Sequence, residues 1–140
     1  MLGRLARYLR ILGFSVIYEH DGIDDNRIVE ICRNNNYVLI TRDRLLSQRY
    51  HPSVLIGSTE IGDQIVEFTR KYKPDRKSLF LRCTVCNGEL IPIELEDGDY
   101  RNRMNPHRCN VCGKIYWSGT HTTNIIEYLE KLGVWNEDQR

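Results

Sequence analysis

The stretch YVLITRD, residues 37–43, decides the fold that we predict for this chain. Val38, Leu39 and Ile40 form a continuous apolar run that asparagines precede and three charged residues follow. Such a run is typical of a strand buried on both faces, in a parallel sheet covered by helices. Ligands of open α/β sheets bind beyond the carboxyl ends of the strands, so Arg42 and Asp43 stand where chemistry is expected.

Helices and strands alternate on both sides of this stretch. Apolar periodicity predicts further elements, which are helices at 2–13, 25–34 and 60–72, strands at 15–18 and 53–56, and a short helix or turn at 45–50. This alternation predicts an α/β fold with a parallel sheet and right-handed crossovers. A strand is also expected ahead of the first helix and is missing. Either the true protein begins upstream of Met1, or three strands suffice, or another chain supplies the edge.

Acidic residues follow the predicted strands. Asp24 and Asp25 precede the second helix, Asp43 follows the YVLIT strand, and Glu60 and Asp63 open the third long helix. Loops after parallel strands emerge at one edge, so we expect these carboxylates to lie together and to hold Mg²⁺ or Mn²⁺. Helix capping is the alternative for Asp24 and Asp25, and a first-turn helix acid is the favoured interpretation of Asp63.

Arginines in the first helix repeat every third position. Arg4, Arg7 and Arg10 form either a solvated helix face or an edge that contacts phosphates. The basic stretch that includes Lys71 and Lys77 is either a plain linker or a strap on nucleic acid. Cys32 falls on the apolar side of the second helix, where we predict a buried thiol.

Two C-x-x-C pairs form the most specific local pattern in the chain. Cys83 and Cys86 precede Cys109 and Cys112 by twenty-two intervening residues. Each pair presents two thiolates from a tight turn, and two such turns complete a tetrahedral Zn²⁺ shell. Four protein ligands leave no open position, so this zinc is predicted to be structural.

The segment between and after these pairs supplies further candidates. A hairpin with an Asp-Gly turn is predicted within residues 90–100, and Gly88 and Gly113 relieve the backbone of the turns. After the second pair, aromatic residues stand beside cations, a pattern that can bind RNA by stacking bases and contacting phosphates. For Trp117 the alternative is packing against the first part of the chain. The residues in this group are Arg108, Lys114, Tyr116, Trp117 and His121.

The composition is that of an ordinary globular protein. The 140 residues are 41% hydrophobic and 28% charged, with a net charge of +1, so any nucleic-acid binding must come from local basic patches. No apolar run has the length of a membrane span and no signal peptide is evident, so we expect a cytoplasmic protein without a membrane partner. The predicted domains are 1–72 for the α/β unit, 73–81 for a basic linker, 82–121 for a zinc ribbon, and 122–140 for a terminal helix and tail.

Taken together, MLGRLARYLRILGF, LITRD, CTVC and HRCNVCGKIYWSGTH resemble the Mut-seven C-terminal RNase-domain family, a PIN-like nuclease fold with a zinc ribbon. The resemblance implies a divalent-metal-dependent ribonuclease, with Asp43 as the acid after the central strand and Asp25 as the acid opening the second helix. It also implies that the four cysteines are zinc ligands. Members of the family have a strand ending in an acid just before the MLG sequence, which is absent here.

The sequence therefore favours an endoribonuclease in which Asp25 and Asp43 hold Mg²⁺ or Mn²⁺ and Arg4, Arg7 and Arg42 neutralise the phosphate. Asp24 and Asp63 are secondary acid candidates. The alternative is a catalytically impaired RNA-binding or ribosome-associated module, which would bind RNA without turnover.

Overall fold

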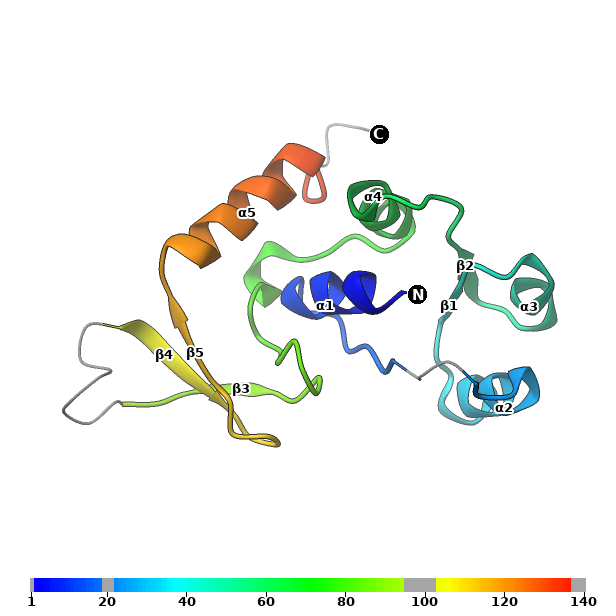
Figure 1. Ribbon diagram of the computed structural model, residues 1–140, viewed down its shortest axis with the longest axis horizontal. Coiled ribbons are helices and arrows are strands. Elements are labelled where there is room, and N and C mark those ends of the chain that lie inside the picture. Colours follow the sequence, from blue (N-terminus) through cyan, green and yellow to red (C-terminus); the bar gives the residue numbers. More distant parts are fainter. Residues whose placement is uncertain (1, 19–21, 95–102, 137–140) are drawn as a thin grey trace.

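The computed structural model describes residues 2–18, 22–94 and 103–136. Its elements, in chain order, are α1 (Gly3–Ile11), α2 (Asp25–Asn35), β1 (Leu39–Thr41), α3 (Arg44–Arg49), β2 (Ser53–Leu55), α4 (Ile61–Lys71), the 3₁₀ helix η1 (Arg76–Ser78), β3 (Leu90–Pro92), β4 (Met104–Cys109), β5 (Ile115–Ser118) and α5 (Thr120–Leu132) (Figure 1). None of the described helices combines the length and the apolar character that crossing a membrane requires.

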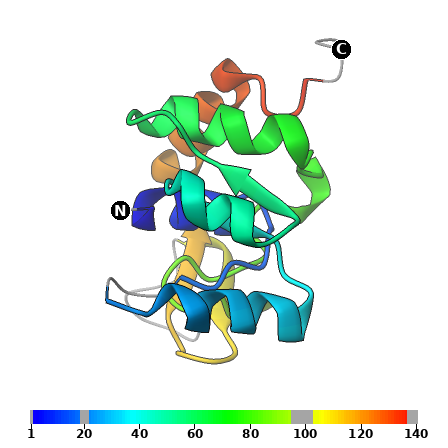
Figure 2. The ribbon, with the colours of Figure 1, turned by 90° about the vertical axis from the view of Figure 1, so that its right-hand side faces the viewer.

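The first sheet is small and parallel, as predicted. β1 pairs with β2 in a register that places Leu39 opposite Ser53 and Thr41 opposite Leu55. Helices flank these strands, and Figure 2 shows α2 and α4 at opposite ends of this region with α3 between them. The fold class is therefore confirmed as a parallel α/β unit followed by a second, separate sheet that carries the cysteines.

The prediction of a strand at 15–18 is wrong. The backbone of Val16 bonds to side chains instead of to a neighbouring strand, since its N–H donates to Asn87 Oδ1 at 2.9 Å and its carbonyl accepts from Arg10. The apolar residues of this segment nevertheless contribute to the fold, since Val16 packs against the main core.

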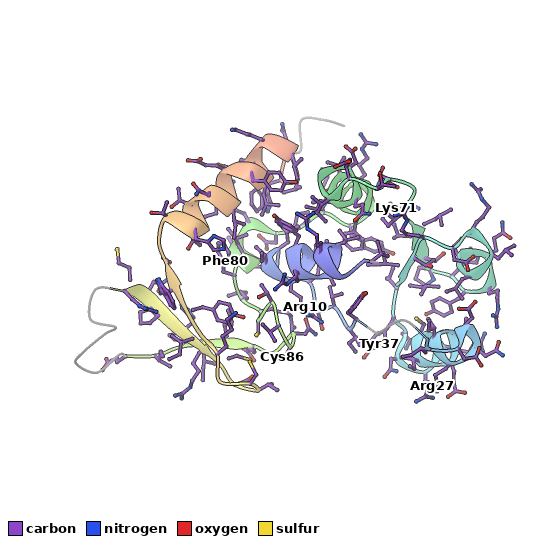
Figure 3. All side chains as sticks on the ribbon, in the orientation of Figure 1. Arg10, Arg27, Tyr37, Lys71, Phe80 and Cys86 are labelled. Carbon is purple, nitrogen blue, oxygen red and sulfur yellow. The ribbon has the colours of Figure 1, made fainter. Side chains whose placement is uncertain are left out.

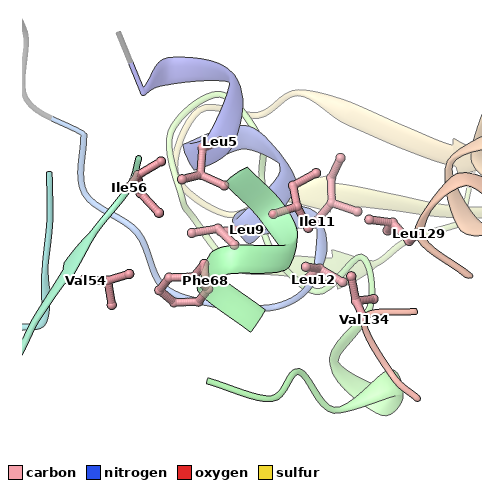
Figure 4. Packing of buried hydrophobic residues seen from close by; sticks show 10 residues of the cluster. Leu5, Leu9, Ile11, Leu12, Val54, Ile56, Phe68, Leu129 and Val134 are labelled. Atoms are coloured by element: carbon pink, nitrogen blue, oxygen red, sulfur yellow. The ribbon is translucent and has the colours of Figure 1, made fainter. Parts of the chain in front are cut away.

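The main core joins α1, β2, α4 and the end of the chain. Leu5 and Leu9 of α1 are fully buried and meet Ile65 of α4, while Leu129 and Val134 close the core from the side of α5 (Figure 4). Helix α1 stops where predicted. Gly13 adopts φ +102°, and a Cβ there would lie 2.4 Å from Ser78 Cβ, so only glycine allows this turn to touch the following linker.

A smaller core holds α2 and α3 against β1. Cys32 is buried there with Val29, Leu39 and Leu46, as predicted for this thiol. Burial raises the pKa of Cys32, so the group stays a neutral thiol.

The second sheet is antiparallel, with strand order β3–β4–β5. Leu90 pairs with Cys109, and Arg108 pairs with Ile115 on the other side of β4. The predicted Asp-Gly turn lies outside the described residues. Strand β5 was not predicted, and it leads directly into α5, which runs back toward α1 and α4 in Figure 1.

The linker between the sheets is packed onto its neighbours. Arg76 pairs with Glu130 of α5 at 2.7 Å, and its guanidinium lies 4.7 Å from the ring centroid of Trp135. The backbone N–H of Phe80 donates to Ile11 O at 2.8 Å. Arg76 is thus paired with an acid and an aromatic ring of the C-terminal segment, which favours the interpretation of this stretch as a linker.

Candidate functional site

The four cysteines of the C-x-x-C pairs converge on one point. Their sulfur atoms all lie within 4.8 Å of one another, with Cys83 Sγ 3.7 Å from Cys112 Sγ and Cys86 Sγ 3.4 Å from Cys109 Sγ. A tetrahedral zinc with bonds of about 2.3 Å would space its sulfurs by about 3.8 Å. The cluster is therefore positioned to hold a metal ion, and its four thiols match the ligands of a structural zinc site.

Two tight turns, which we call knuckles, present these sulfurs. In the first knuckle, residues 83–88, the N–H of Cys83 donates to Gly88 O at 2.7 Å. A Cβ on Gly88 would lie 2.6 Å from Cys109 Sγ, so glycine is needed here for close approach. In the second knuckle, residues 109–113, Gly113 adopts φ +82°. The two glycines thus serve the site for different reasons, and only Gly113 relieves the backbone as predicted.

Hydrogen bonds inside the cluster set its proton affinities. Burial tends to raise the pKa of Cys109, but the N–H groups of Cys112 and Val111 donate to its sulfur and bring the pKa down to about 6. Burial and contacts with the other sulfurs raise the pKa of Cys86 to about 12. The metal-free cluster therefore retains protons, which a metal ion must displace.

Tyr116 supports the cluster from β5. Its hydroxyl lies 3.0 Å from Cys83 Sγ and accepts a hydrogen bond from Thr84 N at 3.2 Å. Burial, followed by the contact with Cys83, raises the pKa of Tyr116 to about 12. The tyrosine predicted as a base-stacking candidate is thus part of the wall around the sulfurs.

Arg10 of helix α1 is hydrogen-bonded to the first knuckle. This side chain is only 8% exposed, and its Nη1 donates to Thr84 O at 2.9 Å while Nη2 donates to Val16 O at 2.7 Å. Figure 3 shows Arg10 between α1 and the segment that carries Cys86. The basic stripe on α1 is therefore shorter than its sequence repeat suggested, because the third arginine is buried.

A cavity of about 560 Å³ lies beside β1. Apolar side chains of α1, of residues 14–18 and of β1 line it, and Arg42 and Asp43 line it at the carboxyl end of β1. Asp43 N-caps α3, since its Oδ1 accepts from Leu45 N at 2.9 Å and from Leu46 N at 3.2 Å. Its Oδ2 accepts no hydrogen bond from a described residue, so one carboxylate oxygen is left for a ligand.

The other predicted acids stand at helix starts outside this cavity. Asp24 caps α2 by accepting from Asn26 N at 3.1 Å, and Asp25 and Asp63 lie in the first turns of α2 and α4. Asp25 is exposed, and its side chain has no hydrogen bond or ion pair with a described residue. Figure 2 places the N-terminal ends of α1, α2 and α4 on one side of the molecule.

Among the described residues, only the cysteines form a group of three or more potential metal ligands. The acids expected to share one neighbourhood do not form such a group. A site of two carboxylates, Asp25 and Asp43, stays a prediction.

The predicted phosphate contacts differ in their surroundings. Arg4 and Arg7 are exposed on α1 and make no hydrogen bond or ion pair with a described residue. Arg42 is half-buried at the cavity, where its charge also acts on Glu67.

Sequence reasoning missed Glu67. Its carboxylate accepts from Gly57 N at 3.0 Å and Ser58 N at 2.9 Å and so fixes the loop after β2. Burial tends to raise the pKa of Glu67, but these hydrogen bonds and the positive charge of Arg42 outweigh it, and the pKa is lowered. Glu67 lies in the middle of a helix, and nothing in its local pattern indicated this role.

The fold and the site thus define an α/β protein with an appended metal-binding cysteine module. Residues 1–129 match the family model described as Mut7-C RNAse domain, so the chain belongs to this family. The family suggests a nuclease-like function, as the resemblance of the sequence implied. No curated protein and no solved structure gives a significant match to the chain.

Proposed function

We propose that the protein is a divalent-metal-dependent endoribonuclease that hydrolyses RNA phosphodiester bonds. The observation that carries the proposal is Asp43, which follows a parallel strand in a chain of an RNase-domain family and keeps one carboxylate oxygen unbonded among the described residues. The carboxyl end of a parallel strand is the usual place for a ligand in this class of fold.

Asp25 and Asp43 are the residues that would hold the ion, with Asp24 and Asp63 as secondary candidates. Carboxylate oxygens are the ligands that Mg²⁺ and Mn²⁺ prefer. When bound, such an ion supplies Lewis acidity and an ionised water for attack on phosphorus. Exposed Arg4 and Arg7, together with Arg42, would neutralise the phosphate of the RNA.

The cysteine cluster has a separate role in this proposal. We assign Zn²⁺ to Cys83, Cys86, Cys109 and Cys112 as a structural ion, because four ligands close the shell. The division into an α/β unit (1–72), a linker (73–81), a ribbon (82–121) and a terminal segment (122–140) belongs to the same proposal. So does a cytoplasmic location, since C-x-x-C thiols persist in reducing compartments.

The test compares the rates at which the wild type and the Asp43→Asn variant cleave a single-stranded RNA in the presence of Mn²⁺. Asparagine retains N-capping ability, so this change removes charge while keeping the cap of α3. We expect cleavage to fall at least about 100-fold, the usual scale for a group that acts on the transition state. Equal rates in the variant and the wild type would remove Asp43 from the mechanism.

Asp75→Asn is the matched control for this test. Asp75 caps η1 by accepting from Lys77 N at 2.9 Å, as Asp43 caps α3, but it does not line the cavity. Its cleavage rate should equal that of the wild type.

The second candidate is an RNA-binding module without turnover. It is favoured by the absence of a group of three acids among the described residues. This candidate predicts RNA affinity that falls with salt and no cleavage in Mn²⁺ by the wild type.

A further inference from the structure

The cysteine module has a second face, which we call the outer face. Strand pairing puts Ile91 opposite Arg108 and Arg108 opposite Ile115, and Trp117 follows Ile115 by two residues. Side chains alternate along a strand, so these four lie on the same side of the sheet. The opposite side carries Leu90, Cys109 and Tyr116, which pack around the sulfurs.

The outer face exposes a large aromatic side chain. Trp117 is 43% exposed and Ile91 is 36% exposed. Neither residue belongs to any of the three hydrophobic cores, so the alternative that Trp117 packs the ribbon against the first part of the chain is wrong. Tryptophan is enriched at binding surfaces, because its ring offers a large apolar area together with a polar N–H group.

Arginine side chains share the outer face with this ring. The guanidinium of Arg103 lies 3.6 Å from the ring centroid of Trp117, and Arg108 is exposed on the same face. The sequence from Arg103 to Ile126 contains no acidic residue. Among the described residues, the acids of the module, Glu89 and Glu94, flank β3, so the described charges on the β4 side of the outer face come from Arg103 and Arg108.

We propose that the outer face binds single-stranded RNA, with an unpaired base stacked at the Trp117–Arg103 pair and a backbone phosphate at Arg108. Aromatic rings and guanidinium planes stack on bases of any sequence, and cations beside them contact the backbone. A duplex hides the faces of its bases, so the outer face selects unpaired RNA. The choice of RNA as the occupant rests on the proposed function and on the two arginine side chains, Arg103 and Arg108.

The test measures binding without cleavage. Zinc-loaded full-length protein is titrated into a fluorescent single-stranded RNA of about 12 nucleotides, long enough to cover one small binding module, in buffer without Mg²⁺ or Mn²⁺. We expect Trp117→Ala to weaken binding by about 5- to 100-fold, the range for loss of one stacked base. Trp117→Phe keeps an aromatic ring and should retain most of the affinity.

Charge is tested separately by Arg108→Gln. This variant should bind more weakly and reduce the slope of log affinity against log salt by about 0.7, the value for one phosphate contact on a single strand. Lys131→Gln, which removes one exposed cation from α5, is the matched control and should leave affinity unchanged.

A second measurement detects RNA binding while the Trp117 side chain is kept. The chain has two tryptophans, so Trp135→Phe leaves Trp117 as the sole indole fluorophore. Single-stranded RNA should quench this fluorescence, and a duplex of the same sequence should quench it less. Zinc content and circular dichroism verify that each variant is folded.

Unchanged affinity in Trp117→Ala, or equal binding of duplex and single strand, would overturn the proposal. Absence of any salt-dependent RNA affinity would also overturn it and would favour a protein contact at the outer face. Cleavage that depends on Asp43 while Trp117→Ala binds normally contradicts only this inference. Binding that depends on Trp117 without any cleavage in Mn²⁺ contradicts only the proposed nuclease activity.

Discussion

The sulfur cluster and the acidic edge of the first sheet differ in how the chain assembles them. The sulfurs come from two short turns that one sheet brings together, and all four lie within 4.8 Å of one another. The acids come from the starts of separate helices, and two of them, Asp24 and Asp43, are helix caps. The four sulfurs thus converge on one point, while the acids are exposed at separate helix starts.

This difference predicts separate effects on stability and on the proposed cleavage when each set of residues is changed. Four thiolates saturate a zinc ion and leave no position for a substrate. Exposed carboxylates hold an ion weakly and leave room for water and phosphate. Changes at the sulfurs should therefore act on folding, and changes at the acids on turnover.

The largest effect is expected from Cys109→Ser or from a zinc chelator. Either change removes the ion from a module with only a small core, so the module should unfold with a loss of several kcal/mol. Zinc content by mass spectrometry and thermal unfolding measure this loss. Asp43→Asn is the control, and a similar loss of stability there would contradict the comparison.

Gly88→Ala should come next, with a cost of about 1–3 kcal/mol, the scale of an overpacked buried site. The new methyl would displace Cys109 Sγ, which lies 2.6 Å from the Cβ position. Gly113→Ala is the matched control. A Cβ at residue 113 has no neighbour within 4 Å, so this variant has only the strain of the positive φ and should cost about 1 kcal/mol. Zinc affinity by competition with a chromogenic chelator separates the two variants.

Arg10→Gln should cost about 1–3 kcal/mol, because it leaves the carbonyls of Val16 and Thr84 without a charged donor. Chemical denaturation measures this loss. Arg7→Gln, three residues earlier on the exposed face of the same helix, should change stability by less than about 0.5 kcal/mol. Equal effects of the two variants would show that Arg10 does not join the modules.

Glu67→Gln should have the smallest effect, under about 1 kcal/mol, since solvent screens this partly exposed group. The pKa of Glu67 is lowered in the folded state, so its carboxylate stabilises the fold above the ordinary pKa of glutamate. This contribution is lost as the pH falls through the lowered pKa. Denaturation from pH 7 to pH 3 should show the wild type and the variant converging in acid.

The cysteine cluster was easier to predict from the sequence than the positions of the acids, because its ligands follow a local pattern. Two C-x-x-C turns at a suitable spacing specify four ligands without knowledge of the fold. The apolar run at 38–40 likewise indicated β1, and the leucine spacing of α1 indicated its buried face.

Contacts between distant segments were not predictable in the same way. Arg10 looked like a third member of a surface stripe, and only the position of the first knuckle explains its burial. The segment at 15–18 has a strand-like pattern, but its backbone bonds to Arg10 and Asn87 instead of a ladder. Glu67 binds a loop ten residues earlier, a contact that no local pattern encodes.

Hydrogen bonds join the first knuckle to residues 15 and 16 and so connect the cysteine cluster to the cavity beside β1. Asn87 of the knuckle holds Ser15 and Val16, and both of these residues line the cavity that ends at Asp43. A metal ion held by the four cysteines would therefore help to keep one wall of that cavity in place without lining it.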